Sequence, residues 1–296
     1  MEVNNIFSFQ ADSEIIINHY NNFPNYLIEF NDSVEAEYCV VYFSSNDLYY
    51  PNTEIAFKEG VLERNRFEWY KNRIHIGHKH IFFRDIKKQW YLTGVNKILN
   101  SPQKIADFIQ EEAKGYKLIF VGSSAGGFIS VIIGQMLNAL RIYTFNGQFE
   151  IKSLLYKKDA NINDPILYRN RYSKDLVPFY DAANFIQNPR SIYYFHSCNN
   201  KWDSEQRLHV RSFSLNVISF KTSNHGLPFL KTNLNAVLSL SKDDLDRLVG
   251  SKLHPLTFSI KMVGLINTIK GLTAIARFVL NKIYIHTLQN WKNTHN

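Results

Sequence analysis

Residues 117–130 read KLIFVGSSAGGFIS, in which an apolar strand runs into Gly-x-Ser-x-Gly and an apolar helix follows at once. A nucleophilic serine needs this context, because small flanking residues let the backbone make the cramped turn from strand to helix. Such a turn holds the Ser124 hydroxyl exposed, and the helix behind it offers free N–H groups to a developing oxyanion. The pattern predicts a nucleophile at Ser124. The alternative is a phosphate-binding glycine turn, but the Walker lysine and the dinucleotide glycine spacing are absent.

A serine nucleophile requires a base, and the base requires an orienting acid. After such a turn the acid comes first along the chain and the histidine second. Of the ten histidines, His225 alone follows a late strand-like run, in the loop Ser-Asn-His-Gly. Asp203 is the only carboxylate in the loop that follows the preceding strand-like run. We therefore expect His225 as base and Asp203 as acid. Asp203 could instead cap the next helix, and Glu205 is then the reserve acid.

The oxyanion hole should combine the backbone N–H of Ala125 with one from the loop after an early strand. The apolar run at residues 38–43 ends in Ser-Ser-Asn. This predicts Ser44 and Ser45 as backbone donors, with Asn46 contributing its side chain. An ordinary polar turn is the alternative.

Apolar runs short enough for strands alternate along the chain with segments of helical spacing. The expected strands are Tyr26–Phe30, Tyr38–Phe43, His80–Arg84, Lys117–Val121, Arg141–Phe145, Ser191–His196 and Asn216–Thr222. The expected helices start at Ser101, which is followed by proline, and after Ser124, and cover Lys174–Ile186, Ser204–Ser212 and Leu227–Leu240. This alternation predicts an α/β fold with a doubly wound, mostly parallel sheet.

Two segments depart from this alternation. Residues 151–190 are rich in tyrosine and arginine and have little strand pattern, which suggests a cap or lid inserted in a catalytic domain that spans residues 1–251. Residues 252–296 contain no acidic residue, and their apolar residues recur every three or four positions. This pattern predicts a basic amphipathic helical tail, broken at Gly264 or Gly271, that binds an anionic membrane surface or packs on the core or on a partner protein.

The composition is that of a globular protein with a real core: of 296 residues, 45% are hydrophobic and 20% are charged. The formal net charge of +8 favours anionic partners, but no nucleic-acid-binding motif accompanies it, so we expect no nucleic-acid partner. The two cysteines, Cys39 and Cys198, form no disulfide framework. The histidines and acidic residues lack metal-ligand spacing, so we expect no metal.

Four short motifs together resemble the α/β-hydrolase superfamily over residues 26–240. They are Phe-Ser-Ser at 43–45, Gly-Ser-Ser-Ala-Gly-Gly at 122–127, Cys-Asn-Asn-Lys-Trp-Asp at 198–203 and Asn-His-Gly at 224–226. They are similar to those of a bacterial group encoded with surface-polysaccharide genes, which includes capsule O-acetyltransferases. The resemblance implies acyl transfer to or from a glycan hydroxyl, with acetyl-CoA as an acyl donor and no bound cofactor.

The leading hypothesis is a serine-dependent O-acetyltransferase or O-acyl esterase that acts on a carbohydrate. Besides Asn46, we expect Trp69, Trp90 and Tyr91 to contact the sugar, because sugar faces stack on aromatic rings; ordinary packing is the alternative for these rings. The competing hypothesis is a non-catalytic scaffold of the same fold in a glycan-assembly complex. No signal peptide and no run of about 20 apolar residues is visible, so we expect a cytoplasmic protein, peripheral at the inner face of the cell membrane at most.

Overall fold

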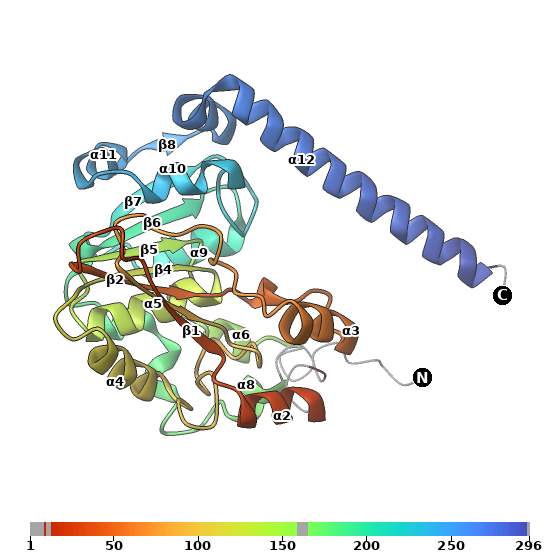
Figure 1. Ribbon diagram of the computed structural model, residues 1–296, viewed down its shortest axis with the longest axis horizontal. Coiled ribbons are helices and arrows are strands. Elements are labelled where there is room, and N and C mark those ends of the chain that lie inside the picture. The colour runs from red at the N-terminus through yellow and green to blue at the C-terminus, as the bar shows by residue number, and fades with distance from the viewer. Residues whose placement is uncertain (1–8, 10–12, 159–164, 295–296) are drawn as a thin grey trace.

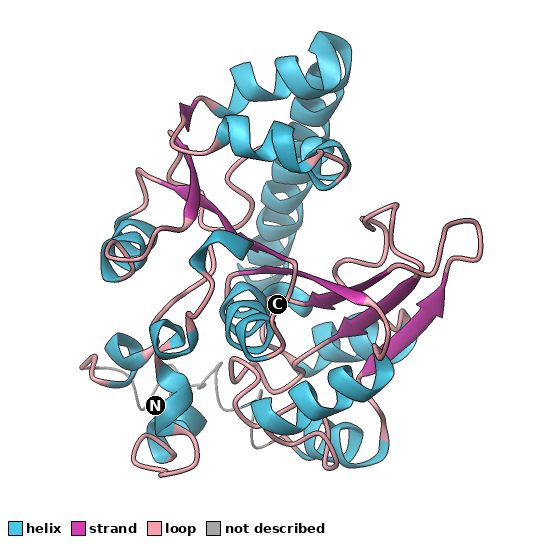
Figure 2. Cartoon of the chain, turned by 90° about the vertical axis from the view of Figure 1, so that its left-hand side faces the viewer, coloured by secondary structure: helices cyan, strands magenta, loops and turns pink. Residues whose placement is uncertain are grey.

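The structure is a computed structural model that describes residue 9, residues 13–158 and residues 165–294, without the side chains of residues 165–166 and 278–294. These residues form one eight-stranded sheet with helices on both sides (Figure 1, Figure 2). The strands are β1 (Tyr26–Phe30), β2 (Tyr38–Phe43), β3 (Lys79–Phe83), β4 (Lys117–Ser123), β5 (Arg141–Phe145), β6 (Ile192–Ser197), β7 (Asn216–Phe220) and β8 (Lys252–Leu253). The predicted α/β architecture is confirmed, with seven of these strands within two residues of their expected bounds.

The order of the strands places the functional loops. Across the sheet the strands lie as β1-β3-β2-β4-β5-β6-β7-β8, and only β1 runs antiparallel to its neighbour. After β2 the chain moves to one side to form β3, and it then returns across β2 to form β4. The chain therefore leaves the carboxyl ends of β2 and β4 in opposite directions. Ligands of open α/β sheets bind at such a switch point, outside the carboxyl ends of the strands.

Both faces of the sheet are buried, which explains the continuous apolar runs in the strands. One face packs against the helices α4 (Pro102–Glu112) and α5 (Ala125–Met136). The opposite face packs against residues 67–74, α10 (Leu234–Leu238) and the start of α12 (Pro255–Thr294). The sheet is therefore the central layer of three. The remaining α-helices are α2 (Glu14–Asn22), α3 (Glu54–Phe57), α6 (Lys152–Leu155), α8 (Pro165–Arg169), α9 (Lys201–His209) and α11 (Lys242–Leu248).

Two predicted helices are wrong in part, and prolines explain both. The segment 174–186 forms two 3₁₀ turns, Val177–Tyr180 and Ala182–Phe185, separated by extended Asp181. Pro178 lacks the N–H that a longer helix would need at that position. The segment 227–240 is helical only from the 3₁₀ turn Lys231–Asn233 through α10, because Pro228 precedes it.

The segment at residues 151–190 packs mainly against the α5 face of the sheet. Ile151, Leu155 and Leu167 are buried in the core on that face. Glu150 and Asp181 form a β-bridge that closes the base of the segment. Residues 159–164 of this predicted cap lie outside the described residues.

The C-terminal segment begins as part of the sheet, because its first two residues form the edge strand β8, which pairs with β7. Phe258, near the start of α12, is buried against Phe220 and Phe229. The helix is broken at Gly264, which has φ 80° and ψ 165°, at one of the two glycines where we expected a break. Beyond this break α12 first packs against Thr232 at Gly271, and its later part extends away from the body of the molecule (Figure 1).

The stretch Pro255–Arg277 passes a test for a membrane-spanning helix although it holds no unbroken run of about 20 apolar residues. By length and composition alone this stretch of 23 residues, which contains an 18-residue window with a mean hydropathy of 1.2, could cross a membrane. Lys261 and Lys270 divide it into shorter apolar runs, so inspection for an unbroken run misses it. The final residues of the predicted tail, 295–296, lie outside the described part of the chain.

Buried histidines on the sheet make stability depend on pH. Burial, with a smaller contribution from Arg207, lowers the pKa of His196 from 6.5 to about 4. Burial also lowers the pKa values of His19 and His80 to about 4. Between pH 6.5 and 4 the unfolded chain binds more protons at these groups than the folded chain, so the free energy of unfolding falls as the pH falls through this window.

We expect His196→Gln to lose less stability than the wild type between pH 7 and pH 4.5, by up to roughly 3 kcal/mol. Urea unfolding at both pH values measures this difference. Identical losses in the two proteins would show that His196 is not buried in its neutral form.

Candidate active site

Ser124 occupies a tight turn between β4 and α5. Its backbone is left-handed, with φ 50° and ψ −122°, which is strained for a residue other than glycine. The flanking glycines make the turn possible. A Cβ on Gly122 would lie 2.1 Å from the carbonyl oxygen of Gly126, and one on Gly126 would lie 2.2 Å from that of Phe43. The Gly-x-Ser-x-Gly spacing is thus a packing requirement.

The structure brings the three predicted catalytic side chains together from three loops. Ser124 Oγ lies 3.0 Å from His225 Nε2, and His225 Nδ1 lies 2.7 Å from Asp203 Oδ1. The carboxylate can only accept, so Nδ1 carries the proton and Nε2 is left to accept the serine proton. His225 is 31% exposed at its side chain, whereas that of Asp203 is 1% exposed. The base therefore faces the solvent side and the acid lies beneath it.

Asp203 does not cap the helix that follows. Helix α9 begins at Lys201, three residues earlier than predicted, and Asn200 is its N-cap. The Asn200 side chain accepts the backbone N–H of Asp203 at 3.1 Å. This leaves the Asp203 carboxylate available to His225. The reserve acid, Glu205, is exposed and lines a separate surface depression, away from His225.

The loop that carries His225 is fixed from β5 by a buried amide. Asn146 Nδ2 donates to the carbonyl oxygens of Asn224 and Gly226, at 3.1 and 2.7 Å. The Asn146 side-chain oxygen accepts the backbone N–H of Ser197 at the end of β6. One side chain thus joins the ends of β5 and β6 to both neighbours of His225.

The three predicted oxyanion donors differ in whether their backbone N–H groups already have a hydrogen-bond partner. Ala125 is the first residue of α5, where a helix leaves its N–H without an intrahelical partner. Ser44 is wrong as a donor, because its N–H already donates to the carbonyl oxygen of Phe83 and extends the sheet. Ser45 N–H donates to Glu68 Oε2 at 2.5 Å. The Glu68 carboxylate therefore occupies the donor that an oxyanion would use at Ser45.

A cleft of about 760 Å³ opens over Ser124 and His225. Asn46 and Trp90, two of the residues expected to contact a sugar, line it. Trp69 and Tyr91 do not line this cleft, which corrects their assignment. The Trp69 indole donates to the carbonyl oxygen of Phe43, and the Tyr91 hydroxyl donates to that of Ser44. Both rings are almost wholly buried, so their role is to hold the end of β2 in place.

Sequence reasoning missed Gln148, which is fully buried beside the nucleophile. Its Nε2 lies 3.2 Å from Ser124 Oγ and 3.3 Å from His225 Nε2. The Trp90 indole donates to Gln148 Oε1 at 3.1 Å, and this fixes the orientation of the amide. Its place just after β5, at the carboxyl edge of the sheet, was the available signal.

Trp202 and Glu68 also belong to the site and were not predicted. The ring centroids of Trp202 and His225 are 4.8 Å apart, so the indole covers one face of the base. Burial raises the pKa of Glu68. Among the described residues no cluster of three or more histidine, cysteine or acidic side chains could hold a metal ion.

The strand order, the strained serine turn and the positions of the acid and histidine after β6 and β7 define an α/β-hydrolase-type fold. No family description matches the chain, and no characterised protein matches its sequence. Among solved structures, the chain is similar to the capsule O-acetyltransferase of Neisseria meningitidis serogroup A. The two are 11% identical, the similarity covers 67% of this chain and 83% of that chain, and the TM-score is 0.45.

Two esterases are similar to this chain at a comparable level. Esterase B from Lactobacillus rhamnosis is 10% identical over 90% of this chain and 91% of its own, with a TM-score of 0.41. A lipase/esterase from Lactobacillus plantarum is 12% identical over 66% of this chain and 84% of its own, with a TM-score of 0.38. The assignment of the fold rests on the topology and the serine turn of this chain itself.

Proposed function

We propose that the chain is a serine-dependent acyl-transfer enzyme, an O-acetyltransferase or O-acyl esterase that acts on a carbohydrate. The observation that carries the proposal is the continuous hydrogen-bonded series from Ser124 through His225 to Asp203, mounted on a strained turn at the edge of the sheet. A serine with a purely structural role does not require a histidine and an aspartate hydrogen-bonded in series to its hydroxyl. The same arrangement is what makes a hydroxyl nucleophilic.

The reaction follows from these positions. Ser124 Oγ attacks the acyl carbonyl carbon while His225 Nε2 takes the serine proton. The resulting oxyanion accepts hydrogen bonds from Ala125 N–H and, once the Glu68 carboxylate has moved, from Ser45 N–H. The bond to the leaving group then breaks, and His225 returns the proton to that group. In the second half, water or a sugar hydroxyl loses its proton to His225 and attacks the acyl-enzyme, and Ser124 regains its proton.

The lining of the cleft supports a carbohydrate as substrate. Trp90 and Trp202 offer aromatic faces, and Asn46, Asn52 and Asn224 offer amides. Sugars present both apolar faces and many hydroxyls, so a lining of this mixed kind suits them. The similarity of the four loop motifs to those of the surface-polysaccharide group supports a role in bacterial surface polysaccharide biosynthesis. In this role acetyl-CoA is the acyl donor and the enzyme is cytoplasmic.

Incubation with radiolabelled acetyl-CoA and a panel of bacterial surface glycans tests this proposal. Label in the glycan shows transfer, and release of acetate from a pre-acetylated glycan shows esterase activity. Failure of both reactions across the panel, in a protein whose Ser124 does not react with fluorophosphonates, would favour the scaffold hypothesis instead.

We also propose that α12 binds an anionic membrane surface through its exposed apolar residues. Ile266 is 70% exposed and Ile269 is 50% exposed, and the basic Lys261, Lys270 and Arg277 lie along the same segment without an acidic residue. Apolar burial combined with attraction to anionic lipid is the physical basis of interfacial binding. Packing on a partner protein is the alternative role for this surface.

The double variant Ile266→Glu/Ile269→Glu should partition onto anionic vesicles at least tenfold more weakly than the wild type, because two apolar contacts are replaced by negative charges. The control Ile55→Glu/Ile98→Glu alters two isoleucines on the body that are at least about as exposed, at 72% and 69%, and should partition like the wild type. Sedimentation with vesicles measures both. Equal partition of all three proteins would rule out the membrane role of α12.

A further inference from the structure

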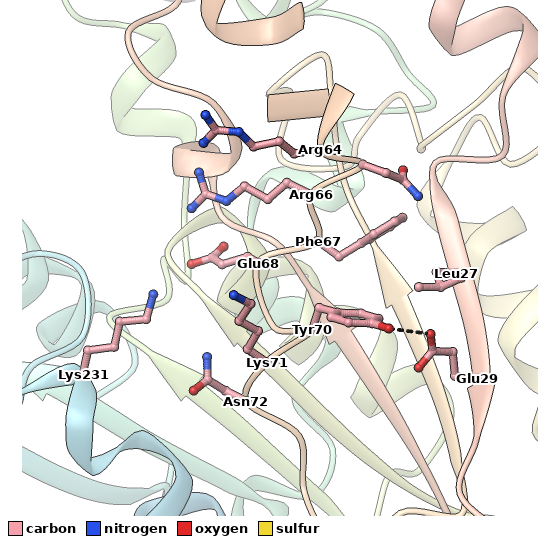
Figure 3. Close-up of a pocket in the computed structure, with 11 residues that line it drawn as sticks. Leu27, Glu29, Arg64, Arg66, Phe67, Glu68, Tyr70, Lys71, Asn72 and Lys231 are labelled. Atoms are coloured by element: carbon pink, nitrogen blue, oxygen red, sulfur yellow. Dashed lines mark hydrogen bonds between the residues drawn. The ribbon is translucent and has the colours of Figure 1, made fainter. Parts of the chain in front are cut away.

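A second cavity lies next to the catalytic cleft, on the side of β1. It measures about 810 Å³. Its wall consists mainly of residues 64–72, with Leu27 and Glu29 from β1 and Lys231 from the loop that precedes α10 (Figure 3). The catalytic cycle proposed above uses none of its cationic side chains.

Four cations line this cavity, of which Arg64 also forms an exposed ion pair of 3.9 Å with Glu59, outside the cavity lining. Figure 3 shows Arg64, Arg66 and Lys71 extending toward the same side of the cavity, with Lys231 reaching toward them from the opposite wall. Within the described residues, the side-chain amines of Lys71 and Lys231 have no hydrogen bond or ion pair, and both residues are exposed. Arg66 donates one hydrogen bond, to the carbonyl oxygen of Leu48, and keeps other N–H groups for a ligand.

The negative charge in the cavity does not cancel these cations. Glu29 is engaged by Arg73 at 2.5 Å and by the Tyr70 hydroxyl at 3.0 Å. Glu68 lies at the inner end, where its carboxylate accepts Ser45 N–H and, at 3.4 Å, the hydroxyl of Ser123. The outer part of the cavity therefore carries an excess of positive charge.

Glu68 also connects the two cavities, since it lines both of them. Along this direction the cations come first, the Glu68 carboxylate second and Ser124 third. An anionic group is attracted to the outer part, and Glu68 repels it from the nucleophile. A ligand that spans both cavities is thereby oriented with its charged group outside and its neutral, reacting part at Ser124.

We propose that this cavity, lined by Arg64, Arg66, Lys71 and Lys231, binds a phosphate group of a substrate whose reacting part enters the catalytic cleft. Phosphate suits the site because its oxygens accept several charge-assisted hydrogen bonds at once, and arginine can bind two of them together. The proposal builds on the acyl-transfer function above. The phosphate can belong to a phosphorylated glycan acceptor or to the CoA of the acyl donor.

Calorimetric titration of the Ser124→Ala protein tests the proposal without any need for turnover. The probes are inorganic pyrophosphate and two matched pairs, glucose 1-phosphate with glucose and CoA with pantetheine. We expect pyrophosphate to bind, and one phosphorylated probe to bind at least tenfold more tightly than its unphosphorylated partner. The pair that shows this gain identifies the source of the phosphate.

Charge-reversal variants locate the binding. Lys71→Glu and Lys231→Glu should each weaken binding of the phosphorylated probe about tenfold and leave its neutral partner unaffected. Lys104→Glu, at an exposed lysine on α4 on the other side of the sheet, changes the net charge equally and should have no effect. All three substitutions are at exposed positions, so matched melting temperatures verify that each variant is folded.

Three outcomes would overturn the proposal. The first is that pyrophosphate does not bind, and the second is that Lys104→Glu weakens binding of the phosphorylated probe as much as Lys71→Glu and Lys231→Glu do. The third is that pyrophosphate binds but neither pair shows a phosphate-dependent gain, which indicates an adventitious ion only. None of them depends on whether Ser124 is catalytic. Failure of the phosphate-site proposal is therefore distinguishable from failure of the acyl-transfer proposal, because the latter is indicated by a wild type that is not labelled by fluorophosphonates.

Discussion

Replacement of Ser124 by alanine should abolish covalent labelling by a fluorophosphonate and lower the rate of acyl transfer about a million-fold. The reagent forms a bond to an activated oxygen, and Ser124 Oγ is the hydroxyl placed 3.0 Å from the base. Without this oxygen no acyl-enzyme can form, and His225 has nothing to activate except water. Intact-mass measurement shows a single adduct on the wild type and none on the variant.

Ser123→Ala is the matched control for this experiment. Ser123 is the neighbouring residue in the chain, but its hydroxyl points to Glu68 and is buried, away from His225. Its replacement should leave labelling at Ser124 intact. Labelling that survives in Ser124→Ala, or disappears in Ser123→Ala alone, would assign the nucleophile to another residue. A folded wild type that takes no label would favour the scaffold hypothesis.

The strands were predictable because parallel strands buried on both faces must be continuously apolar. Residues 38–43 and 117–121 show this pattern directly, and in the structure the two strands pair with each other in the interior of the sheet. Helices were less predictable where proline interrupts an otherwise helical spacing, as Pro178 and Pro228 do. The edge strand β8 has only two residues and left no pattern to detect.

The site divides in the same way between local and long-range signals. The turn at Ser124 is encoded locally, since Gly122 and Gly126 are needed within four residues of each other. Gln148 was missed because its contact with Ser124 depends on two strands being neighbours in space. The predicted sugar contact of Trp69 was wrong for the same reason, because only the fold shows that its indole donates to the carbonyl oxygen of Phe43 in the core.

Asp203→Asn should reduce acyl transfer about ten-thousand-fold while leaving the fold intact. The Asp203 carboxylate accepts the proton-bearing Nδ1 of His225 at 2.7 Å, and this sets the tautomer in which Nε2 can take the serine proton. Its second oxygen, Oδ2, is buried without a hydrogen bond among the described residues. An amide there can turn its NH₂ group toward His225, which favours the opposite tautomer and leaves Ser124 without a base.

Glu205→Gln is the control that separates the two acids considered from the sequence. Glu205 lies two residues further along α9, but it is exposed and lines a different depression, so its neutralisation should leave activity within about twofold of the wild type. The kcat of both variants, measured with a soluble acyl ester, decides between them. A large loss in Glu205→Gln with little loss in Asp203→Asn would contradict the assignment of the acid. Large losses in both, with unchanged melting temperatures, would mean that His225 is oriented by α9 as a whole, since both acids lie on that helix.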